Sequence, residues 1–177
     1  NFLPIDNSRL LDSAPCDVEH MRVRTSVPQH VKSSAEYKAF LQRVARNPEL
    51  LNVLKPTHPL DPEVVMSISH LADRDGWAHS LQLHPDGYAS YVKYQPAEMK
   101  YGIRWLWRTQ DEDALGLSSP ATAEPEGYST EKKKGNMLVL PGKGSLRFSF
   151  AAGLVRPPEA KRLEAHIDSI CRSYDQA

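Results

Sequence analysis

The chain has 177 residues, 40% of them hydrophobic, and its 22 basic and 22 acidic side chains give a formal net charge of zero. This length and hydrophobic content are enough for a single β-rich domain over residues 1–177 that needs no disulfide or structural metal. The balanced charge argues against nucleic-acid and anionic-membrane partners, and no apolar run approaches the about 20 residues that span a bilayer.

The first predicted element is a helix at residues 33–47, which follows an irregular stretch at residues 1–31. Ser33 and Glu36 have the spacing of a capping box, in which each side chain bonds the other residue's backbone N–H. The apolar residues of this segment recur at helical spacing and predict one buried face. They are Tyr37, Phe40, Leu41 and Val44.

Strand patterns begin at residues 64–71, which are β-branched and apolar. Residues 77–94 predict a β-hairpin around the turn Pro85-Asp86-Gly87. Proline presets φ for such a turn, and glycine accepts the positive φ that the turn requires.

The next predicted strand, residues 101–109, has two different faces. Trp105 and Trp107 share one face, while Arg104 and Arg108 share the other. Two tryptophans at alternate positions favour a core face over a platform for a sugar, so we expect both rings to be buried. The arginines then face either solvent or a cleft, where they would bind hydroxyl or carboxylate groups.

The rest of the chain predicts a short strand at residues 114–117, a second hairpin and a closing helix. The hairpin pairs residues 136–140 with residues 145–154 through the turn Pro141-Gly142-Lys143-Gly144. The helix at residues 157–174 has an apolar stripe. The elements together predict a mainly β fold, an antiparallel β-sandwich with one or two peripheral helices. The stripe consists of Leu163, Ile167, Ile170 and Tyr174.

Residues 114–135 form the segment in which we expect the functional site. Pro120 and Pro125 stiffen the segment, which is rich in carboxylates and hydroxyls. Loops held by a sheet are frequent binding sites, and carboxylate, guanidinium and aromatic groups suit the hydroxyls and apolar faces of a sugar. The alternative is an ordinary polar surface loop, in which Lys132-Lys133-Lys134 is a solvated turn.

Two motifs follow each other in this part of the chain. Residues 119–128 read Ser-Pro-Ala-Thr-Ala-Glu-Pro-Glu-Gly-Tyr, and residues 139–148 read Val-Leu-Pro-Gly-Lys-Gly-Ser-Leu-Arg-Phe. With their flanking strands, over residues 103–154, they resemble the closing part of the aldose 1-epimerase (galactose mutarotase-like) family. The resemblance implies a sugar-binding antiparallel sandwich. Because a complete sandwich of that family is longer, the chain would be its later half or a smaller relative.

The resemblance also implies site residues. Family members use a glutamate base and a histidine acid, but Ser119 occupies the position of the glutamate and is far too weak a base. Glu124 is therefore the leading catalytic candidate. The earlier part of the chain lacks the Asn/His/aromatic context of the family's acid histidine. The expected sugar contacts are Arg108, Glu126, Tyr128, Arg104 and His79.

Other kinds of site have little support in the sequence. A metal site needs three or four convergent ligands, whereas the histidines are scattered, so we expect neither a metal nor a cofactor. Cys16 and Cys171 have no motif spacing and are expected to be free thiols. No Gly-x-Ser-x-Gly elbow is present, and Gly142-Lys143-Gly144 does not join a strand to a helix as a phosphate loop does.

Three functional hypotheses remain open. The first is an aldose-1-epimerase-like isomerase acting on a free aldose or related sugar. The second is a non-catalytic carbohydrate-binding sandwich, and the third is a protein-interaction domain without a small-molecule site. A histidine facing Glu124 across one pocket would distinguish the first from the second, and the third predicts no polar pocket near Glu124.

The expected partners follow from the same reasoning. They are a sugar ligand and a second chain or N-terminal half that completes the sandwich. The compartment is open, with the cytoplasm favoured because no signal-peptide pattern begins the sequence.

Overall fold

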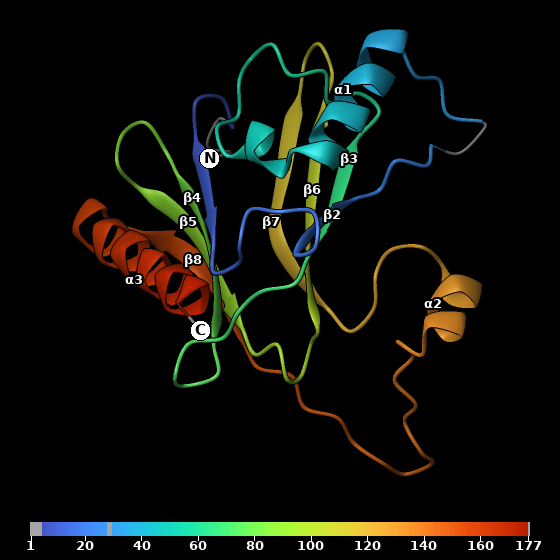
Figure 1. Cartoon of the computed structure of the whole chain (residues 1–177), viewed down its shortest axis with the longest axis vertical. Coiled ribbons are helices and arrows are strands. Elements are labelled where there is room, and N and C mark those ends of the chain that lie inside the picture. The colour runs from blue at the N-terminus through green and yellow to red at the C-terminus, as the bar shows by residue number, and fades with distance from the viewer. Residues whose placement is uncertain (1–4, 28–29, 177) are drawn as a thin grey trace.

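The computed structural model describes residues 5–27 and 30–176 (Figure 1). Its strands form two four-stranded antiparallel sheets, ordered β1-β4-β5-β8 and β2-β3-β6-β7. The first sheet contains β1 (Arg9–Asp12), β4 (Ala78–Leu83), β5 (Ala89–Tyr94) and β8 (Phe150–Val155). The second contains β2 (Met21–Val23), β3 (Val64–Ile68), β6 (Tyr101–Arg108) and β7 (Asp113–Ala121). The helices are α1 (Ala35–Arg46), the 3-10 helix η1 (Pro48–Leu51), α2 (Tyr128–Lys134) and α3 (Pro157–Asp175).

The predicted first helix is present as α1, with one correction at its start. Ser34, not Ser33, is the N-cap, and its side chain accepts a hydrogen bond from the Tyr37 backbone N–H at 3.0 Å. All four residues of the predicted apolar face are buried. They join α1 to Val64 and Leu106 in the main apolar core. The expectation of an irregular N-terminal region is wrong in part, because β1 and β2 lie within it.

The first predicted hairpin is confirmed as β4 and β5, which pair from Ala78↔Tyr94 to Leu83↔Ala89. Gly87 has the positive φ, 86°, that its place in the turn predicted. Helix α3 is also confirmed, and Figure 1 shows it beside β4, β5 and β8. Ile167 of α3 is 2% exposed and packs in a cluster with Leu81 of β4.

The two faces of β6 are separated as predicted, but the tryptophan face lies outside. Arg104 is 2% exposed, whereas Trp105 is 37% exposed. The rings of Trp105 and Trp107 stack on each other with centroids 6.2 Å apart. The expectation of a tryptophan core is therefore wrong. The arginine face is the inner one because it also carries Leu106, which is buried in the apolar core, and because Asp12 of β1 compensates the Arg104 charge there.

Strand β7 runs further than the predicted short strand and takes in the start of the predicted loop. Pro120 pairs with Gly102 and Ser119 with Ile103, and the register then shifts, so that Trp105 pairs with Gly116. Strand β7 is the last strand of its sheet. A proline is tolerated at such an edge because its missing N–H interrupts no inner ladder.

The second predicted hairpin is wrong. The turn forms, with the Gly144 N–H donating to the Pro141 carbonyl at 2.9 Å, but residues 136–149 contain no strand. Strand β8 instead pairs with β5, from Ala89↔Val155 to Tyr94↔Phe150. Figure 1 shows the preceding segment looping away from both sheets. The edge of β5 offers unpaired backbone groups along a whole strand, and β8 satisfies them.

Two further observations concern the chain as a whole. Cys16 and Cys171 are free, as predicted. Among the described residues, no helix has both the length and the apolar character needed to cross a membrane.

Candidate functional site

The structure brings only part of the predicted sugar-binding set together. Glu124 and Glu126 follow the end of β7 and line one pocket beside the β2-β3-β6-β7 sheet. Arg104, Arg108 and His79 lie at three other places in the fold. Nearby Tyr128 is the first residue of α2, is 65% exposed and does not line this pocket.

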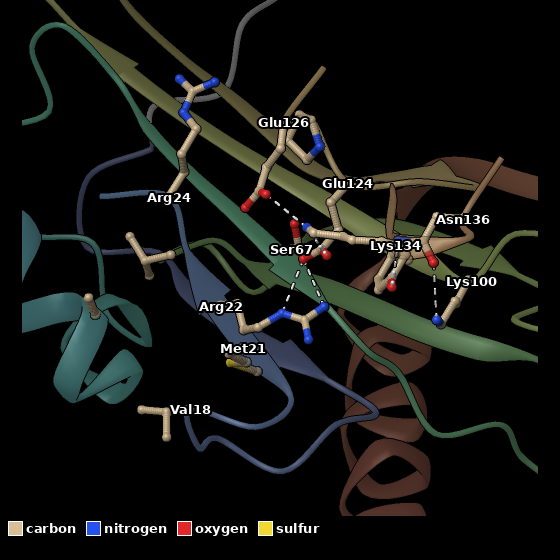
Figure 2. A pocket seen from close by; sticks show the side chains of 14 residues that line it. Val18, Met21, Arg22, Arg24, Ser67, Lys100, Glu124, Glu126, Lys134 and Asn136 are labelled. Atoms are coloured by element: carbon tan, nitrogen blue, oxygen red, sulfur yellow. Dashed lines mark hydrogen bonds and ion pairs between the residues drawn. The ribbon is translucent and has the colours of Figure 1, made fainter. Parts of the chain in front are cut away.

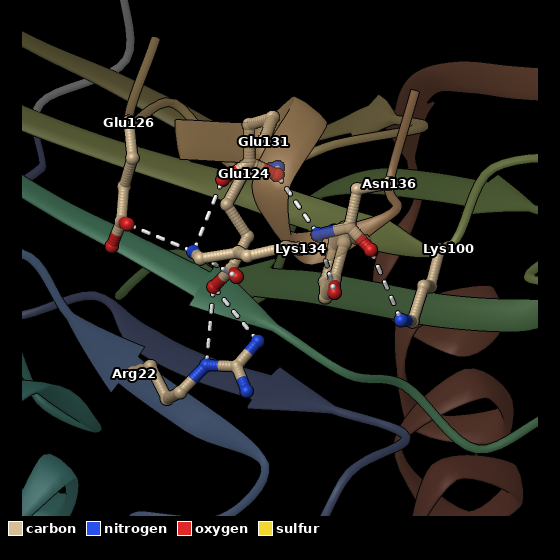
Figure 3. Close-up of polar contacts among 8 residues, drawn as sticks. Arg22, Lys100, Glu124, Glu126, Glu131, Lys134 and Asn136 are labelled. Carbon is tan, nitrogen blue, oxygen red and sulfur yellow. Dashed lines mark hydrogen bonds and ion pairs between the residues drawn. The ribbon is translucent and has the colours of Figure 1, made fainter. Parts of the chain in front are cut away.

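Glu124 is held by two cations from opposite sides (Figure 3). Its Oε1 accepts hydrogen bonds from Arg22 Nε at 3.1 Å and Arg22 Nη2 at 2.7 Å, and its Oε2 accepts one from Lys134 Nζ at 3.0 Å. The side chain is only 7% exposed. Both carboxylate oxygens are therefore oriented before any ligand arrives, and the charge of the buried group is compensated.

Helix α2 exists at this point because of charged contacts more than apolar ones. Its only buried residue is Glu131, whose Oε2 accepts a hydrogen bond from the Glu124 backbone N–H at 2.9 Å. Lys134 pairs with Glu131, Glu124 and Glu126 at 3.0, 3.0 and 2.8 Å, and the bonds to Glu126 and Glu124 raise the pKa of Lys134. The prediction of a solvated lysine turn is therefore wrong for Lys134.

The pocket beside Glu124 has a volume of about 610 Å³ and a wall of both charged and apolar side chains (Figure 2). Four cationic side chains line it together with the two glutamates, and Val18 and Met21 add apolar surface. Two of the cations lie near the ring of Tyr101, at 5.7 Å for the Arg22 guanidinium and 5.1 Å for Lys100 Nζ. The cationic residues are Arg22, Arg24, Lys100 and Lys134.

No histidine is among the described residues that line this pocket. The wall can therefore donate and accept hydrogen bonds, but it offers no imidazole acid opposite Glu124. Sequence reasoning missed Arg22 and Lys100, because neither residue belongs to a motif. Arg22 lies in a strand of three residues, and its contact with Glu124 spans 102 positions.

Arg104 is part of a buried polar network between the sheets. Its Nη2 donates to both oxygens of Asp12 at 2.8 Å, and its Nε donates to the Leu117 carbonyl at 3.1 Å. Asp12 also contacts His70 Nε2 at 3.2 Å and accepts a bond from Ser80 Oγ at 2.7 Å. The polar groups of the network satisfy one another's hydrogen bonds, so Arg104 is not available to a ligand.

The network predicts a specific acid sensitivity. Burial alone would raise the pKa of Asp12, but the Arg104 charge and hydrogen bonds from His70 and Ser80 hold it far below its usual range. A carboxyl group with a lowered folded-state pKa stabilises the fold above its unfolded pKa, and this contribution is lost as the pH falls. We therefore expect the free energy of unfolding to drop steeply below about pH 4, the ordinary aspartate range.

The check is urea denaturation of the wild type and Asp12→Asn between about pH 6 and about pH 2. The variant should be less stable at the upper end and should depend less on pH at the lower end. Parallel pH profiles for the two proteins would show that Asp12 is not the responsible group.

Arg108 and His79 also have protein partners. Arg108 pairs with Asp6 and donates to the Pro56 carbonyl at 2.9 Å, beside a separate pocket of about 490 Å³. His79 points from β4 towards α3, where its Nδ1 lies 2.7 Å from the Tyr91 hydroxyl. Neither residue lines the Glu124 pocket.

Comparison with known proteins identifies the fold. No family model and no curated protein matches the sequence. A crystal structure described as "a putative aldose 1-epimerase" from Klebsiella pneumoniae is similar, with a TM-score of 0.67 and 16% identity. The match covers 97% of this chain and 40% of that chain. The chain therefore has an aldose-epimerase-like β fold and spans less than half the length of that relative, so the predicted resemblance is confirmed at the level of the fold.

Proposed function

We propose that the chain is a carbohydrate-binding domain that uses the Glu124 pocket and does not interconvert anomers. The observation that carries this proposal is a pocket in an aldose-epimerase-like fold whose wall, among the described residues, contains two glutamates but no histidine. Anomer exchange needs a base on one side of the sugar and an acid on the other. Glu124 already accepts bonds from Arg22 and Lys134 through both oxygens, which disfavours it as a base.

The charge balance of the pocket favours a neutral sugar. Two of the lining cations form ion pairs with glutamates that do not line the pocket, Arg24 with Glu63 and Lys134 with Glu131. Arg22 and Lys134 also bind Glu124, which leaves Lys100 as the cation whose contacts are weakest, a 3.4 Å bond to Asn136 and the Tyr101 ring. A phosphate would need more unpaired positive charge than this wall supplies.

The test is saturation-transfer NMR against a panel of free aldoses and sugar phosphates. We expect a neutral aldose to bind and its anomers to exchange no faster than in buffer. Lys100→Met should weaken binding about tenfold or more, because a hydrogen bond to a charged group contributes about 1.5–3 kcal/mol. The matched control is Lys38→Met, on the exposed face of α1 and outside the pocket.

Each other outcome favours one of the remaining hypotheses. Faster anomer exchange that is lost in Glu124→Gln would establish the isomerase. Binding that Lys100→Met leaves unchanged would place the sugar elsewhere. No binding to any sugar of the panel would favour the hypothesis of a protein-interaction domain.

Completion of the sandwich by a second chain or an N-terminal half stays a prediction. It is favoured by large apolar side chains that are exposed along residues 137–154, since such patches commonly mark interaction surfaces. Val139 is 79% exposed and Phe150 is 64% exposed.

A further inference from the structure

Three potential metal ligands converge between the first sheet and α3. Asp73 lies in the loop between β3 and β4, His79 lies on β4, and His166 lies on α3. Asp73 Oδ2 is 2.9 Å from His79 Nε2 and 3.2 Å from His166 Nε2. One ligand atom from each residue lies within 4.8 Å of the other two.

The surroundings of these residues orient the ligand atoms. Asp73 Oδ1 accepts bonds from the backbone N–H groups of Asp75 and Trp77, each at 2.9 Å, which leaves Oδ2 directed at the two imidazoles. His79 Nδ1 lies 2.7 Å from the Tyr91 hydroxyl. An imidazole that binds a metal through one nitrogen usually donates a hydrogen bond from the other, and the Tyr91 oxygen is placed to accept it.

We propose that Asp73, His79 and His166 bind a divalent transition-metal ion of the zinc class. Two imidazoles and one carboxylate suit Zn²⁺ better than Mg²⁺ or Ca²⁺, which prefer oxygen ligands alone. Zn²⁺ bonds of about 2.0–2.1 Å in tetrahedral geometry place ligand atoms about 3.3 Å apart. The two separations from Asp73 Oδ2 are close to that value already, so small movements of the side chains would admit the ion.

The site is accessible on one side. The His79 side chain is 6% exposed and that of Asp73 is 12% exposed, whereas that of His166 is 43% exposed. Asp73 and His166 also line a neighbouring pocket of about 760 Å³. The fourth position of a tetrahedral ion would face this opening and take a water molecule or an external ligand. A bound ion would also join α3 directly to β4.

Sequence patterns do not reveal this arrangement, because 93 positions separate Asp73 from His166. The proposal therefore departs from the prediction that the histidines are scattered and bind no metal. Another interpretation of the contacts is an ordinary hydrogen-bonded cluster that holds α3 in place. The two interpretations differ in whether Zn²⁺ binds and in whether His166 is needed for binding.

The experiment is calorimetric titration of the chelator-treated protein with Zn²⁺, and visible absorption after addition of Co²⁺. We expect one ion per chain, a Co²⁺ spectrum of tetrahedral type and a higher Tm with Zn²⁺. His166→Gln should weaken binding more than about tenfold and abolish the Tm shift. His166 is the ligand chosen for substitution because its side chain is partly exposed, so the replacement leaves the apolar core intact.

The matched control is His20→Gln. His20 forms a His–Asp pair with Asp17 at 3.0 Å but belongs to no three-residue ligand group found among the described residues. This variant should bind Zn²⁺ like the wild type. Absence of Zn²⁺ binding, binding that persists in His166→Gln, or equal loss in His20→Gln would each overturn the proposal. None of these results depends on sugar binding.

Discussion

Replacing Arg104 with methionine is expected to lower the free energy of unfolding by about 3–5 kcal/mol, because it leaves a buried carboxylate without its cation. Arg104 and Asp12 both have side chains that are 2% exposed, so water cannot take over the lost bonds. Urea denaturation near neutral pH, monitored by tryptophan fluorescence and circular dichroism, measures the change.

Two further variants test whether the unpaired charge is the cause. Arg9→Met removes an ion pair with Glu164 in which the arginine side chain is 54% exposed, and it should cost about 0–1 kcal/mol. Adding Asp12→Asn to Arg104→Met should recover part of the loss, since the charge is then gone. A double variant that loses the sum of both single effects would contradict the assignment.

Replacing Ile167 with alanine is expected to lower the free energy of unfolding by about 2–5 kcal/mol, the usual range for a large buried aliphatic side chain. Ile167 is 2% exposed and belongs to the cluster that joins α3 to the sheet through Leu81 and Ala89. Ile170→Ala, at a half-buried position of the same helix, is the control and should cost less. The same urea titration compares them, and equal losses would mean that Ile167 does not anchor α3.

Local sequence patterns correctly predicted the elements whose defining residues lie within one short segment of the chain. Helices α1 and α3 have apolar residues at helical spacing. The β4–β5 hairpin has its turn chemistry in three consecutive residues, Pro85 to Gly87. Each of these signals is complete within one short segment and agrees with the final fold, so it predicts the element correctly.

Elements without a local signal were missed. Strand β1 has four residues and β2 has three, too few for a period to be recognised. Helix α2 has seven residues and buries only Glu131, so it shows no apolar stripe. The two strands pair with segments that are distant in sequence, and single-sequence patterns do not contain that information.

The same distinction explains the outcome for the candidate site. Alternation along β6 separated the arginine face from the tryptophan face, but the partners of the inner face are distant in sequence: Asp12, which binds Arg104, lies 92 positions away. Glu124 and Glu126 were predicted to belong together because they are neighbours in one loop. Arg22 could not be predicted as a third member of this site, since no pattern near it in the sequence indicates contact with Glu124.

The strand order also has a consequence for synthesis of the chain on the ribosome. The β2-β3-β6-β7 sheet can close as soon as residue 121 has emerged, but the β1-β4-β5-β8 sheet needs residues 150–155. Until then the edge of β5 has no neighbour and the surface that α3 covers is open to solvent. An unpaired strand edge of this kind favours pairing with other chains, so β8 also protects the sheet against aggregation once it has been added.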